Sequence, residues 1–244
     1  MIIGSNRIFF KELESTNSYL SRALVTEQLT EGTIVLTEYQ SAGKGQTGNK
    51  WESEKGKNLT FSIILYPSFI RPSEQFLISV AISLGICDYL RRHIDNCFIK
   101  WPNDIYVSND KIAGILIEHS LMADKIQYTI AGIGLNINQE RFISDAINPV
   151  SLKLLTGLEY DLDIALEQLS LDLDKRYNQL INKKFGQLRN DYIRQIFRLN
   201  EWSQFKDSSG YFRGRITTVT DEGLVRVEKE GGEVVDYASN LRYL

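Results

Sequence analysis

The residues best suited to chemistry lie close together between residues 39 and 51. This run contains three glycines and two lysines, which are Gly43, Gly45, Gly48, Lys44 and Lys50. Glycine exposes the neighbouring backbone N–H groups and a lysine ammonium adds positive charge, so a loop of this composition can bind a phosphate or another anion. Glycine also weakens helices and strands. The run therefore predicts an anion-binding loop and not a packed element.

The segments on either side decide among the known glycine-containing motifs. Residues 32–38 and 58–65 are rich in β-branched and aliphatic residues, so the loop joins two strands. The dinucleotide fingerprint needs a helix after its last glycine, and a Walker A loop needs lysine where Asn49 stands. Neither His93 nor His119 begins the H-R-D loop of a protein kinase. An anion-binding loop and a surface hairpin with incidental lysines remain open.

Two more lysines stand at the ends of predicted strands. Lys100 lies in the predicted strand 97–101, and Lys111 begins the predicted strand 111–118. A lysine among apolar neighbours is unfavourably desolvated unless it meets an anion. A solvated position after a turn is the alternative for Lys111. Gly114 favours the functional interpretation, because glycine within a strand often marks the close approach of a ligand or of another backbone.

Glycines recur in the next predicted strand. Residues 126–138 contain Gly132 and Gly134 and end on Asn136 and Asn138. Because several strands carry glycine at internal positions, we expect one face of the sheet to be cleared for a flat ligand.

Polar residues also gather before the first predicted helix. Ser15, Thr16 and Asn17 precede apolar residues at helical spacing, and one of the three is enough for an N-cap. Three in a row exceed that need. The start of a helix also presents free N–H groups, so capping and ligand binding are both open for these residues.

The remaining pattern predicts two domains. Helices are predicted over residues 73–94, 161–182 and 185–197, and strands over residues 7–10, 32–38, 58–65, 97–101 and 105–107. After residue 199, short alternating strands separated by glycine-containing turns predict a small β-barrel. We therefore expect an α+β fold with a mixed sheet and flanking helices in residues 1–198, and a C-terminal barrel in residues 199–244.

Composition argues against several classes of protein. The chain has 244 residues, a net charge of -3 and a pI of about 5.6, so no overall positive field favours DNA as a partner. Cys87 and Cys97 form no C-x-x-C pair and are interpreted as reduced core residues, which predicts a cytoplasmic protein. The first residues form no charged-then-apolar leader, and the apolar segment 76–86 is far shorter than a bilayer span, so no membrane is expected.

With these segments placed, the chain resembles the biotin-protein ligases. Five motifs carry the resemblance in matching order: Glu14-Ser15-Thr16-Asn17, residues 38–45 with Trp51, Lys100-Trp101-Pro102-Asn103-Asp104, residues 111–118, and Gly132-Ile133-Gly134-Leu135-Asn136. The resemblance covers the whole chain and is weaker after residue 199. It implies a catalytic domain related to class II aminoacyl-tRNA synthetases and an SH3-like C-terminal barrel. The chain starts at the expected catalytic strand, so the expected form lacks the N-terminal helix-turn-helix domain of many bacterial relatives.

The resemblance also implies roles for individual residues. Biotin would contact Ser15, Thr16, Asn17, Gln40, Gly43, Lys44, Gly45, Gln46, Lys111, Gly114, Gly132 and Gly134. ATP would contact Lys44, Gly45, Gln46, Thr47, Gly48, Asn49, Trp51, Lys100, Asn103, Asp104 and Asn136. Lys111 and Lys44 would be catalytic, and Asp104 would hold Mg²⁺ together with ATP. Lys44, Gln46 and Asn49 stand where arginines are frequent in the family, so the guanidinium fork is lost there, and Gln46 also loses the charge.

The chemistry that the resemblance implies has two steps. The carboxylate of biotin attacks the α-phosphate of ATP and forms biotinyl-5'-AMP and pyrophosphate. A lysine amine of a biotin carboxyl carrier protein then attacks this mixed anhydride and forms an amide. No enzyme nucleophile is required, and the motifs contain no Ser-His-Asp or Cys-His arrangement. Catalysis would rest on positioning, on cations at the phosphate and on the exclusion of water.

Two other functions are to be distinguished from this one. A lipoate- or octanoyl-transferring enzyme on the same fold should lack the segment from Lys100 to Asp104. A nucleic-acid regulator would need a basic patch with exposed aromatic residues, whereas acidic residues offset the arginines of the predicted barrel. The expected partner is the biotin carrier domain of acetyl-CoA carboxylase or a related carboxylase, with no DNA. A monomer and a homodimer are both open.

Overall fold

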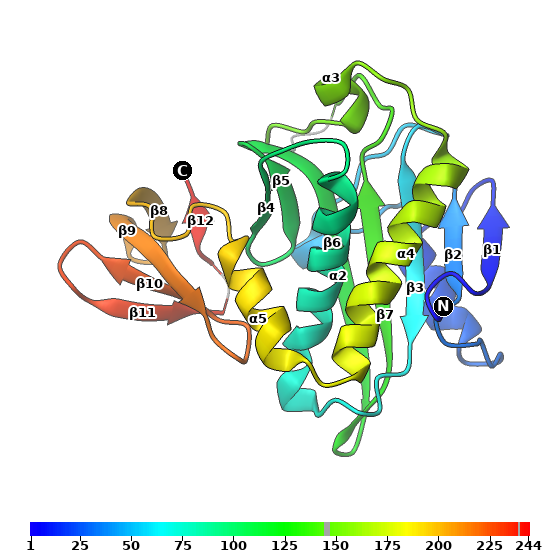
Figure 1. The fold of residues 1–244 in the computed structure, drawn as a ribbon, viewed down its shortest axis with the longest axis horizontal. Helices are drawn as coiled ribbons and strands as arrows, with labels where there is room; N and C mark the ends of the chain where they lie inside the picture. The colour runs from blue at the N-terminus through cyan, green and yellow to red at the C-terminus, as the bar shows by residue number, and fades with distance from the viewer. Residues whose placement is uncertain (144–146, 239) are drawn as a thin grey trace.

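The computed structural model describes residues 1–143, 147–238 and 240–244, apart from the side chain of Thr47 (Figure 1). Its main feature is a seven-stranded sheet with the strand order β1-β2-β3-β7-β6-β5-β4. The strands are β1 (Arg7–Phe10), β2 (Ile34–Thr37), β3 (Leu59–Leu65), β4 (Cys97–Lys100), β5 (Asp104–Val107), β6 (Asp110–Met122) and β7 (Lys125–Leu135). The pair β1–β2 is parallel and the other pairs are antiparallel, so the sheet is mixed as expected.

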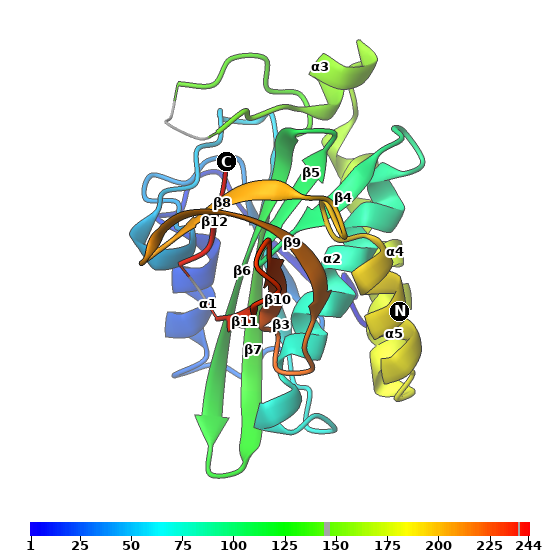
Figure 2. The same cartoon turned by 90° about the vertical axis from the view of Figure 1, so that its left-hand side faces the viewer.

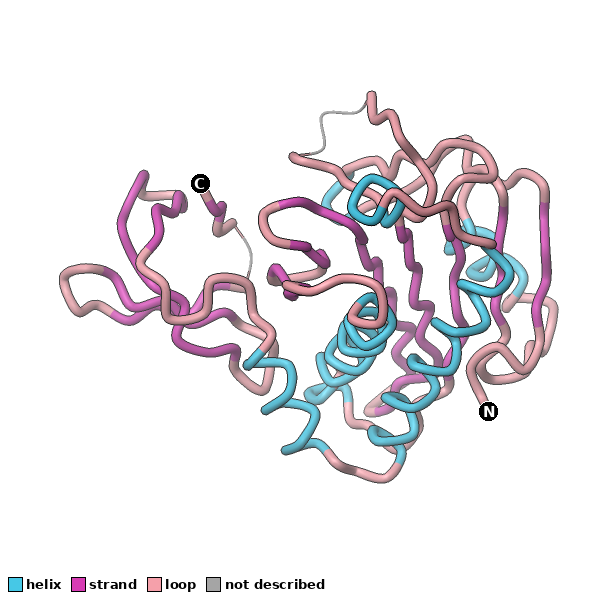
Figure 3. Tube along the Cα trace, turned by 45° about the horizontal axis from the view of Figure 1, so that its top comes forward, coloured by secondary structure: helices cyan, strands magenta, loops and turns pink. Residues whose placement is uncertain are grey.

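Helices cover both faces of this sheet (Figure 2). They are α1 (Thr16–Ala23), α2 (Phe76–Leu90), α3 (Leu152–Thr156), α4 (Leu162–Ile181) and α5 (Phe185–Arg194), with short 3₁₀ turns η1 (Gln46–Gly48) and η2 (Pro72–Glu74). Figure 3 shows α2 and α4 side by side across one face, where they contact each other extensively. On the other face, α1 packs Leu20 against Val35, Ile64 and Ile130 of the sheet. The buried strands β3 and β7 therefore lie between two layers of helix.

Helix α2 is the central helix of the core. Its apolar residues lie all around the helix, and nearly all are buried because α2 packs against the sheet, α4 and α5. Together with η2 it makes the stretch Pro72–Leu90, which at 19 residues and a mean hydropathy of 1.2 is long and apolar enough to span a membrane. The expectation that the apolar segment is far shorter than a span is therefore wrong in length. However, 67% of the apolar part of this stretch is buried inside the protein, as in a core helix.

The C-terminal residues form a separate five-stranded antiparallel sheet, with the order β11-β10-β9-β8-β12. Its strands are β8 (Ser203–Asp207), β9 (Gly210–Val219), β10 (Val225–Lys229), β11 (Val234–Tyr237) and β12 (Arg242–Tyr243). The sequence pattern did not indicate β8 or the two-residue β12. The molecule is thus an α+β protein with a C-terminal β domain, and the boundary between residues 198 and 199 stays a prediction.

The two sheets are joined by specific contacts at the β9–β10 turn. Trp101 Nε1 donates to the carbonyl oxygen of Gly223 at 2.8 Å, and Arg189 pairs with Asp221 at 2.9 Å. Gly223 has a φ of +88°, and a Cβ there would lie 2.5 Å from the ring of Phe76. The turn therefore lies against α2, α5 and the end of β4, in a conformation that glycine adopts readily.

Candidate active site

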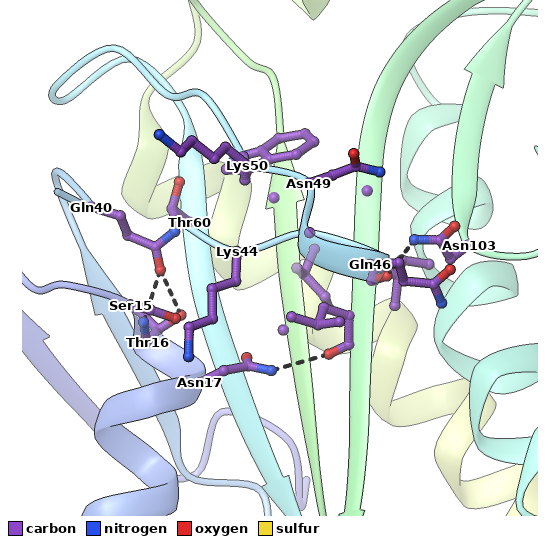
Figure 4. Close-up of a pocket in the computed structure, with 18 of the residues that line it drawn as sticks. Ser15, Thr16, Asn17, Gln40, Lys44, Gln46, Asn49, Lys50, Thr60 and Asn103 are labelled. Atoms are coloured by element: carbon purple, nitrogen blue, oxygen red, sulfur yellow. Dashed lines mark hydrogen bonds between the residues drawn. The ribbon is translucent and has the colours of Figure 1, made fainter. Parts of the chain in front are cut away.

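A cavity of about 190 Å³ opens where the N-terminus of α1, the glycine-rich segment and strands β3, β6 and β7 meet (Figure 4). Most of the predicted site residues line it: Ser15, Thr16, Asn17, Gln40, Lys44, Gly45, Gln46, Asn49, Trp51, Asn103, Asp104, Lys111, Gly114, Gly132 and Gly134. Segments that are more than 100 residues apart in the sequence therefore meet in one site. Gly43, Gly48, Lys100 and Asn136 are not among the residues lining this cavity, and the side chain of Thr47 lies outside the described part.

One end of the cavity is polar and buried. Ser15, Thr16 and Asn17 are each only 3% exposed. Ser15 is the N-cap of α1, and its Oγ accepts a long hydrogen bond of 3.5 Å from Ser18 N. Gln40 Oε1 accepts from Thr16 N at 2.8 Å and from Thr16 Oγ1 at 3.2 Å. One residue caps the helix while its neighbours face the cavity, so capping and ligand-facing positions coexist here.

Ser62 and Glu118 fix the orientation of these polar side chains. Ser62 is fully buried on β3, and its hydroxyl lies 2.6 Å from Thr16 Oγ1 and 2.5 Å from Asn17 Oδ1. Asn17 Nδ2 donates to Glu118 Oε2 at 2.7 Å and to the carbonyl oxygen of Leu116 at 3.3 Å. The amide of Asn17 therefore has its donor group engaged by β6 and its oxygen directed toward β3.

The internal glycines of β6 and β7 make room for side chains of this chain. A Cβ at Gly134 would lie 2.2 Å from the indole of Trp51, and one at Gly114 would lie 2.9 Å from it. At Gly132 a Cβ would lie 2.2 Å from Asn17 Oδ1. The sheet face is cleared as the sequence predicted, but in this structure the flat group on it is the ring of Trp51.

Lys111 lies beside that ring and beside an acid. Its Nζ is 2.7 Å from Asp104 Oδ1 and 5.7 Å from the ring centroid of Trp51. Asp104 is brought there by β5, which pairs it with Gly114 on β6. Asn103 Nδ2 donates to the carbonyl oxygen of Ile115 at 2.9 Å, which holds the start of β5 against β6. The cavity thus contains an ammonium that is held in place by a carboxylate.

The glycine-rich segment forms a closed hairpin between β2 and β3, so it joins two strands as predicted. Gly45 N donates to the carbonyl oxygen of Asn49 at 2.7 Å, and Trp51 N donates to that of Gly43 at 3.0 Å. The tip is the 3₁₀ turn η1, in which Gly48 has a φ of +81°. Gly43 is buried, and a Cβ there would lie 2.5 Å from the carbonyl oxygen of Trp51. Glycine at this position therefore permits the two arms of the hairpin to close.

Lys100 and Asn136 lie outside the main cavity. Lys100 Nζ donates to the hydroxyl of Tyr106 at 2.9 Å, and burial lowers the pKa of Lys100 although the charge of Asp104 opposes this. Asn136 lines a smaller cavity of about 50 Å³ beside Trp51 and Phe142. Its Nδ2 donates to the carbonyl oxygen of Val150 at 3.0 Å, whereas its buried Oδ1 has no partner among the described residues.

Sequence reasoning missed Ser62, Thr60 and Glu118. Thr60 and Ser62 alternate with apolar residues along β3, and this spacing places both on one face of the strand. A buried strand with hydroxyls on one face was the available signal. Glu118 was part of a recognised motif, but no role followed from its position at the end of the predicted strand.

Comparison with known proteins decides the family. The model of the biotin/lipoate A/B protein ligase family matches residues 9–136, which is more than half of the chain and contains every residue that lines the main cavity. The chain belongs to this family. The cavity is therefore the candidate active site of a ligase, and its residues lie inside the matched segment.

Individual members of this ligase family are similar along nearly the whole chain. The bifunctional ligase/repressor BirA of Bacillus subtilis (strain 168) is 27% identical over 246 residues, which cover 98% of this chain and 74% of that protein. The biotin--[acetyl-CoA-carboxylase] ligase of Paracoccus denitrificans is 27% identical over 240 residues, which cover 94% of this chain and 98% of that protein.

Solved structures of such ligases share the fold. The biotin protein ligase of Aquifex aeolicus in complex with biotin and ATP matches with a TM-score of 0.81 and 24% identity, over 98% of this chain and 100% of that one. The ligase of Leishmania major in complex with biotinyl-5-AMP matches with a TM-score of 0.59 and 21% identity, over 96% of this chain and 99% of that one. Both matches cover nearly the whole length of the present chain and therefore include its C-terminal β domain.

Proposed function

We propose that this ligase activates biotin with ATP to biotinyl-5'-AMP and transfers the biotinyl group to a lysine of a carrier protein. The observation that carries the choice of biotin is the buried polar end of the cavity. Biotin ends in a cyclic urea with two N–H donors and one carbonyl acceptor, whereas octanoate ends in a hydrocarbon and lipoate in a disulfide ring. Buried hydroxyl and amide groups can exchange hydrogen bonds with the urea. An apolar ligand would leave without a partner every such group that has no hydrogen bond within the protein.

Lys111 and Lys44 are proposed to act on the charged end of the substrates. Figure 4 shows Lys44 extending from the hairpin into the cavity, toward the side that carries Asn17. Asp104 holds the ammonium of Lys111 beside Trp51, so the cation needs little reorganisation when an anion arrives. Lys111 can then bind both the carboxylate of biotin and the α-phosphate as their oxygen and phosphorus atoms form the new bond.

The remaining steps follow from the same arrangement. Pyrophosphate leaves when the carboxylate oxygen bonds to the α-phosphorus. The closed hairpin excludes water from the resulting anhydride until an amine nitrogen attacks its carbonyl carbon and AMP leaves. For ATP, the free Oδ1 of Asn136 is an acceptor for an amino group such as that of adenine, and Trp51 offers an aromatic face for stacking.

Magnesium is proposed to enter with ATP. The described residues contain no group of three or more His, Cys, Asp or Glu side chains that could hold a metal ion. Asp104 is the carboxylate that lines the cavity, and its Oδ1 is engaged by Lys111 at 2.7 Å. Mg²⁺ is commonly held by one or two carboxylates together with substrate phosphates, and one carboxylate fits that pattern. Bound there, the ion would neutralise charge on the phosphates.

The proposed acceptor is the biotin carboxyl carrier domain of acetyl-CoA carboxylase or a related carboxylase. Support comes from the similarity to the biotin--[acetyl-CoA-carboxylase] ligase of Paracoccus denitrificans over 94% of this chain. The proposal requires no DNA contact and no membrane.

The test is the mass of a carrier domain after incubation with the protein, ATP, magnesium and an acid. With biotin the domain gains the biotinyl mass, and with lipoate or octanoate it gains nothing. Lys111→Ala lowers the rate of pyrophosphate release by about one to two powers of ten, because a charged hydrogen bond contributes about 1.5–3 kcal/mol. The control Lys125→Ala, exposed at the start of β7, leaves the rate unchanged. A folded protein that transfers octanoate in preference to biotin contradicts the assignment.

A further inference from the structure

Gln139 lies just beyond the end of β7 and is only 1% exposed. Its Oε1 accepts from Glu54 N at 2.9 Å and from Asn58 Nδ2 at 2.5 Å. Its Nε2 donates to the carbonyl oxygen of Arg141 at 2.8 Å and to Glu52 Oε1 at 3.3 Å. A primary amide has two N–H donors and two oxygen lone pairs, so this side chain uses its full hydrogen-bonding capacity inside the protein. We call these four bonds the Gln139 latch.

The Gln139 latch joins two segments that are far apart in the sequence. Segment 51–58 leads from the end of the glycine-rich hairpin into β3, and segment 136–143 follows β7. A further bond connects the same two segments, because Ile143 N donates to Glu52 Oε1 at 2.9 Å. Since Gln139 is the buried member of this connection, its amide fixes the two segments to each other at a point that is shielded from water.

The same two segments supply the groups proposed to bind adenine. Trp51 and Glu52 come from the first segment, Asn136 and Phe142 come from the second, and all four line the cavity of about 50 Å³. Trp51 immediately precedes Glu52, and Asn136 is three residues before Gln139. The stacking face and the free acceptor oxygen therefore stand on separate segments, and the distance between them depends on what holds those segments together.

We propose that Gln139 is a positioning residue for the nucleotide: its latch sets the spacing between the ring of Trp51 and Oδ1 of Asn136 into which adenine fits. The inference rests on the proposed function and deepens it. In this arrangement Gln139 touches neither substrate and acts through segments 51–58 and 136–143.

The latch is expected to matter for ATP and not for biotin. Thr16 and Asn17, at the polar end of the main cavity, are oriented by the hydroxyl of Ser62 and not by the latch. Adenine is remote from the atoms that form and break bonds, so its contacts contribute equally to the bound ground state and to the transition state. Loss of such contacts raises the KM for ATP and leaves kcat unchanged.

Biotin-dependent ATP–pyrophosphate exchange tests this inference. Gln139→Leu, which is similar in size but has no polar atoms in its side chain, raises the KM for ATP about tenfold and leaves kcat within about twofold. The dissociation constant for biotin alone, measured by titration calorimetry, stays within about twofold. The matched control Gln127→Leu, exposed on β7, changes none of the three values. A fall in kcat at unchanged KM, as when only the folded fraction is reduced, overturns the proposal, and so does an equal loss of affinity for biotin.

A second variant removes the other end of the connection. Glu52→Leu deletes the carboxylate that accepts from Gln139 and Ile143, and it raises the KM for ATP even if Gln139→Leu fails to fold. In the double variant the KM is no higher than in the weaker-binding single variant, because both changes break the same connection. Effects that multiply in the double variant mean that the two residues act independently, and they overturn the proposal.

Amide hydrogen exchange followed by NMR tests the latch without any substrate. The N–H of Glu54 donates to Gln139, so it exchanges at least about tenfold faster in Gln139→Leu than in wild type, and at the wild-type rate in Gln127→Leu. Unchanged exchange at Glu54 in Gln139→Leu overturns the proposal. If wild-type protein shows no biotin-dependent pyrophosphate exchange, the proposed function fails, while the amide of Glu54 still decides whether Gln139 holds the two segments together.

Discussion

Ser62 shows how an uncharged side chain behind the cavity can orient the polar side chains that line it. It is buried between Thr16 and Asn17, and it lies directly opposite Gly132 in the β3–β7 pairing. Because Gly132 has no side chain, Asn17 can approach the sheet closely enough to meet the hydroxyl of Ser62. The donor and acceptor pattern offered to a ligand is therefore decided by residues behind the cavity wall.

Removal of this hydroxyl provides the residue-scale prediction. Ser62→Ala raises the dissociation constant for biotin about fivefold, because about 1 kcal/mol of hydrogen bonding that orients Thr16 and Asn17 is lost. Titration calorimetry with biotin alone measures this change. Ser170→Ala is the matched control, since Ser170 is equally buried but its hydroxyl donates to the carbonyl oxygen of Leu166 in α4. Equal affinities in wild type and Ser62→Ala would show that Ser62 does not orient the site.

At the scale of elements, the hairpin from Gly43 to Trp51 is closed by backbone hydrogen bonds while several of its side chains are exposed. Its arms are joined by backbone hydrogen bonds, yet Lys44, Asn49 and Lys50 are exposed. Few buried apolar contacts and exposed hydrogen bonds mark a segment that opens at low free energy. A ligand phosphate at its N–H groups would favour the closed form.

We accordingly predict that this hairpin exchanges its amide hydrogens rapidly in the free protein and slowly with biotin plus ATP. Hydrogen exchange followed by mass spectrometry checks this. Gly43→Ala prevents full closure, because a Cβ would lie 2.5 Å from the carbonyl oxygen of Trp51, and protection by ligand is then lost. Gly186→Ala, where a Cβ meets nothing within 4 Å, is the control. Equal protection with and without ligand would mean that the hairpin is rigid.

A second element-scale prediction concerns the β8–β9 turn. Hydroxyls of Ser209 and Tyr237 donate to Asp207 at 2.6 Å and 2.8 Å, and they lower the pKa of Asp207 from 3.8 to about 2. The folded pKa is below the unfolded one, so the ionised group stabilises the fold above about pH 4, and this stabilisation is lost as the pH falls toward 2. Asp207→Asn therefore lowers Tm at pH 6 but not at pH 2.

Thermal unfolding of both proteins across this pH range measures the difference. Asp124→Asn, in the exposed β6–β7 turn, serves as the control and gives a Tm difference that is small at every pH. A Tm gap between wild type and Asp207→Asn that stays constant from pH 6 to pH 2 would contradict the assigned role of the carboxylate.

At the scale of the whole molecule, Trp101 supplies one of the contacts between the two domains. Trp101→Phe removes the donor to Gly223 and leaves a carbonyl without that partner, which lowers the free energy of unfolding by about 2 kcal/mol. For a chain of this size the Tm falls by about 4–8 °C. Trp202→Phe, 41% exposed beside the C-terminal sheet, changes Tm by at most about 2 °C. Calorimetry that finds the two variants equally stable would argue against docking through Trp101.

Local patterns in the sequence were sufficient for much of the fold. The periodicity of α2 and α4 and the β-branched runs of β2 and β3 are local properties, and the polar run at Ser15 and the position of Lys111 follow from them. The position of Lys100 does not, because the rings that hold it come from residues as distant as Tyr243. Strand β12 has only two residues, which is too short for any period to be recognised.

The indole of Trp51 is a fluorophore that borders the site. It rests on Gly114 and Gly134, and its Nε1 has no hydrogen-bond partner among the described residues. Trp101 belongs to the domain contact and Trp202 to the C-terminal β domain, so Trp51 is the one of the three tryptophans that borders the cavity in the described structure. Ligand entry changes the polarity around one fluorophore alone. Intrinsic emission can therefore report occupancy of the site in real time, without a label and without turnover.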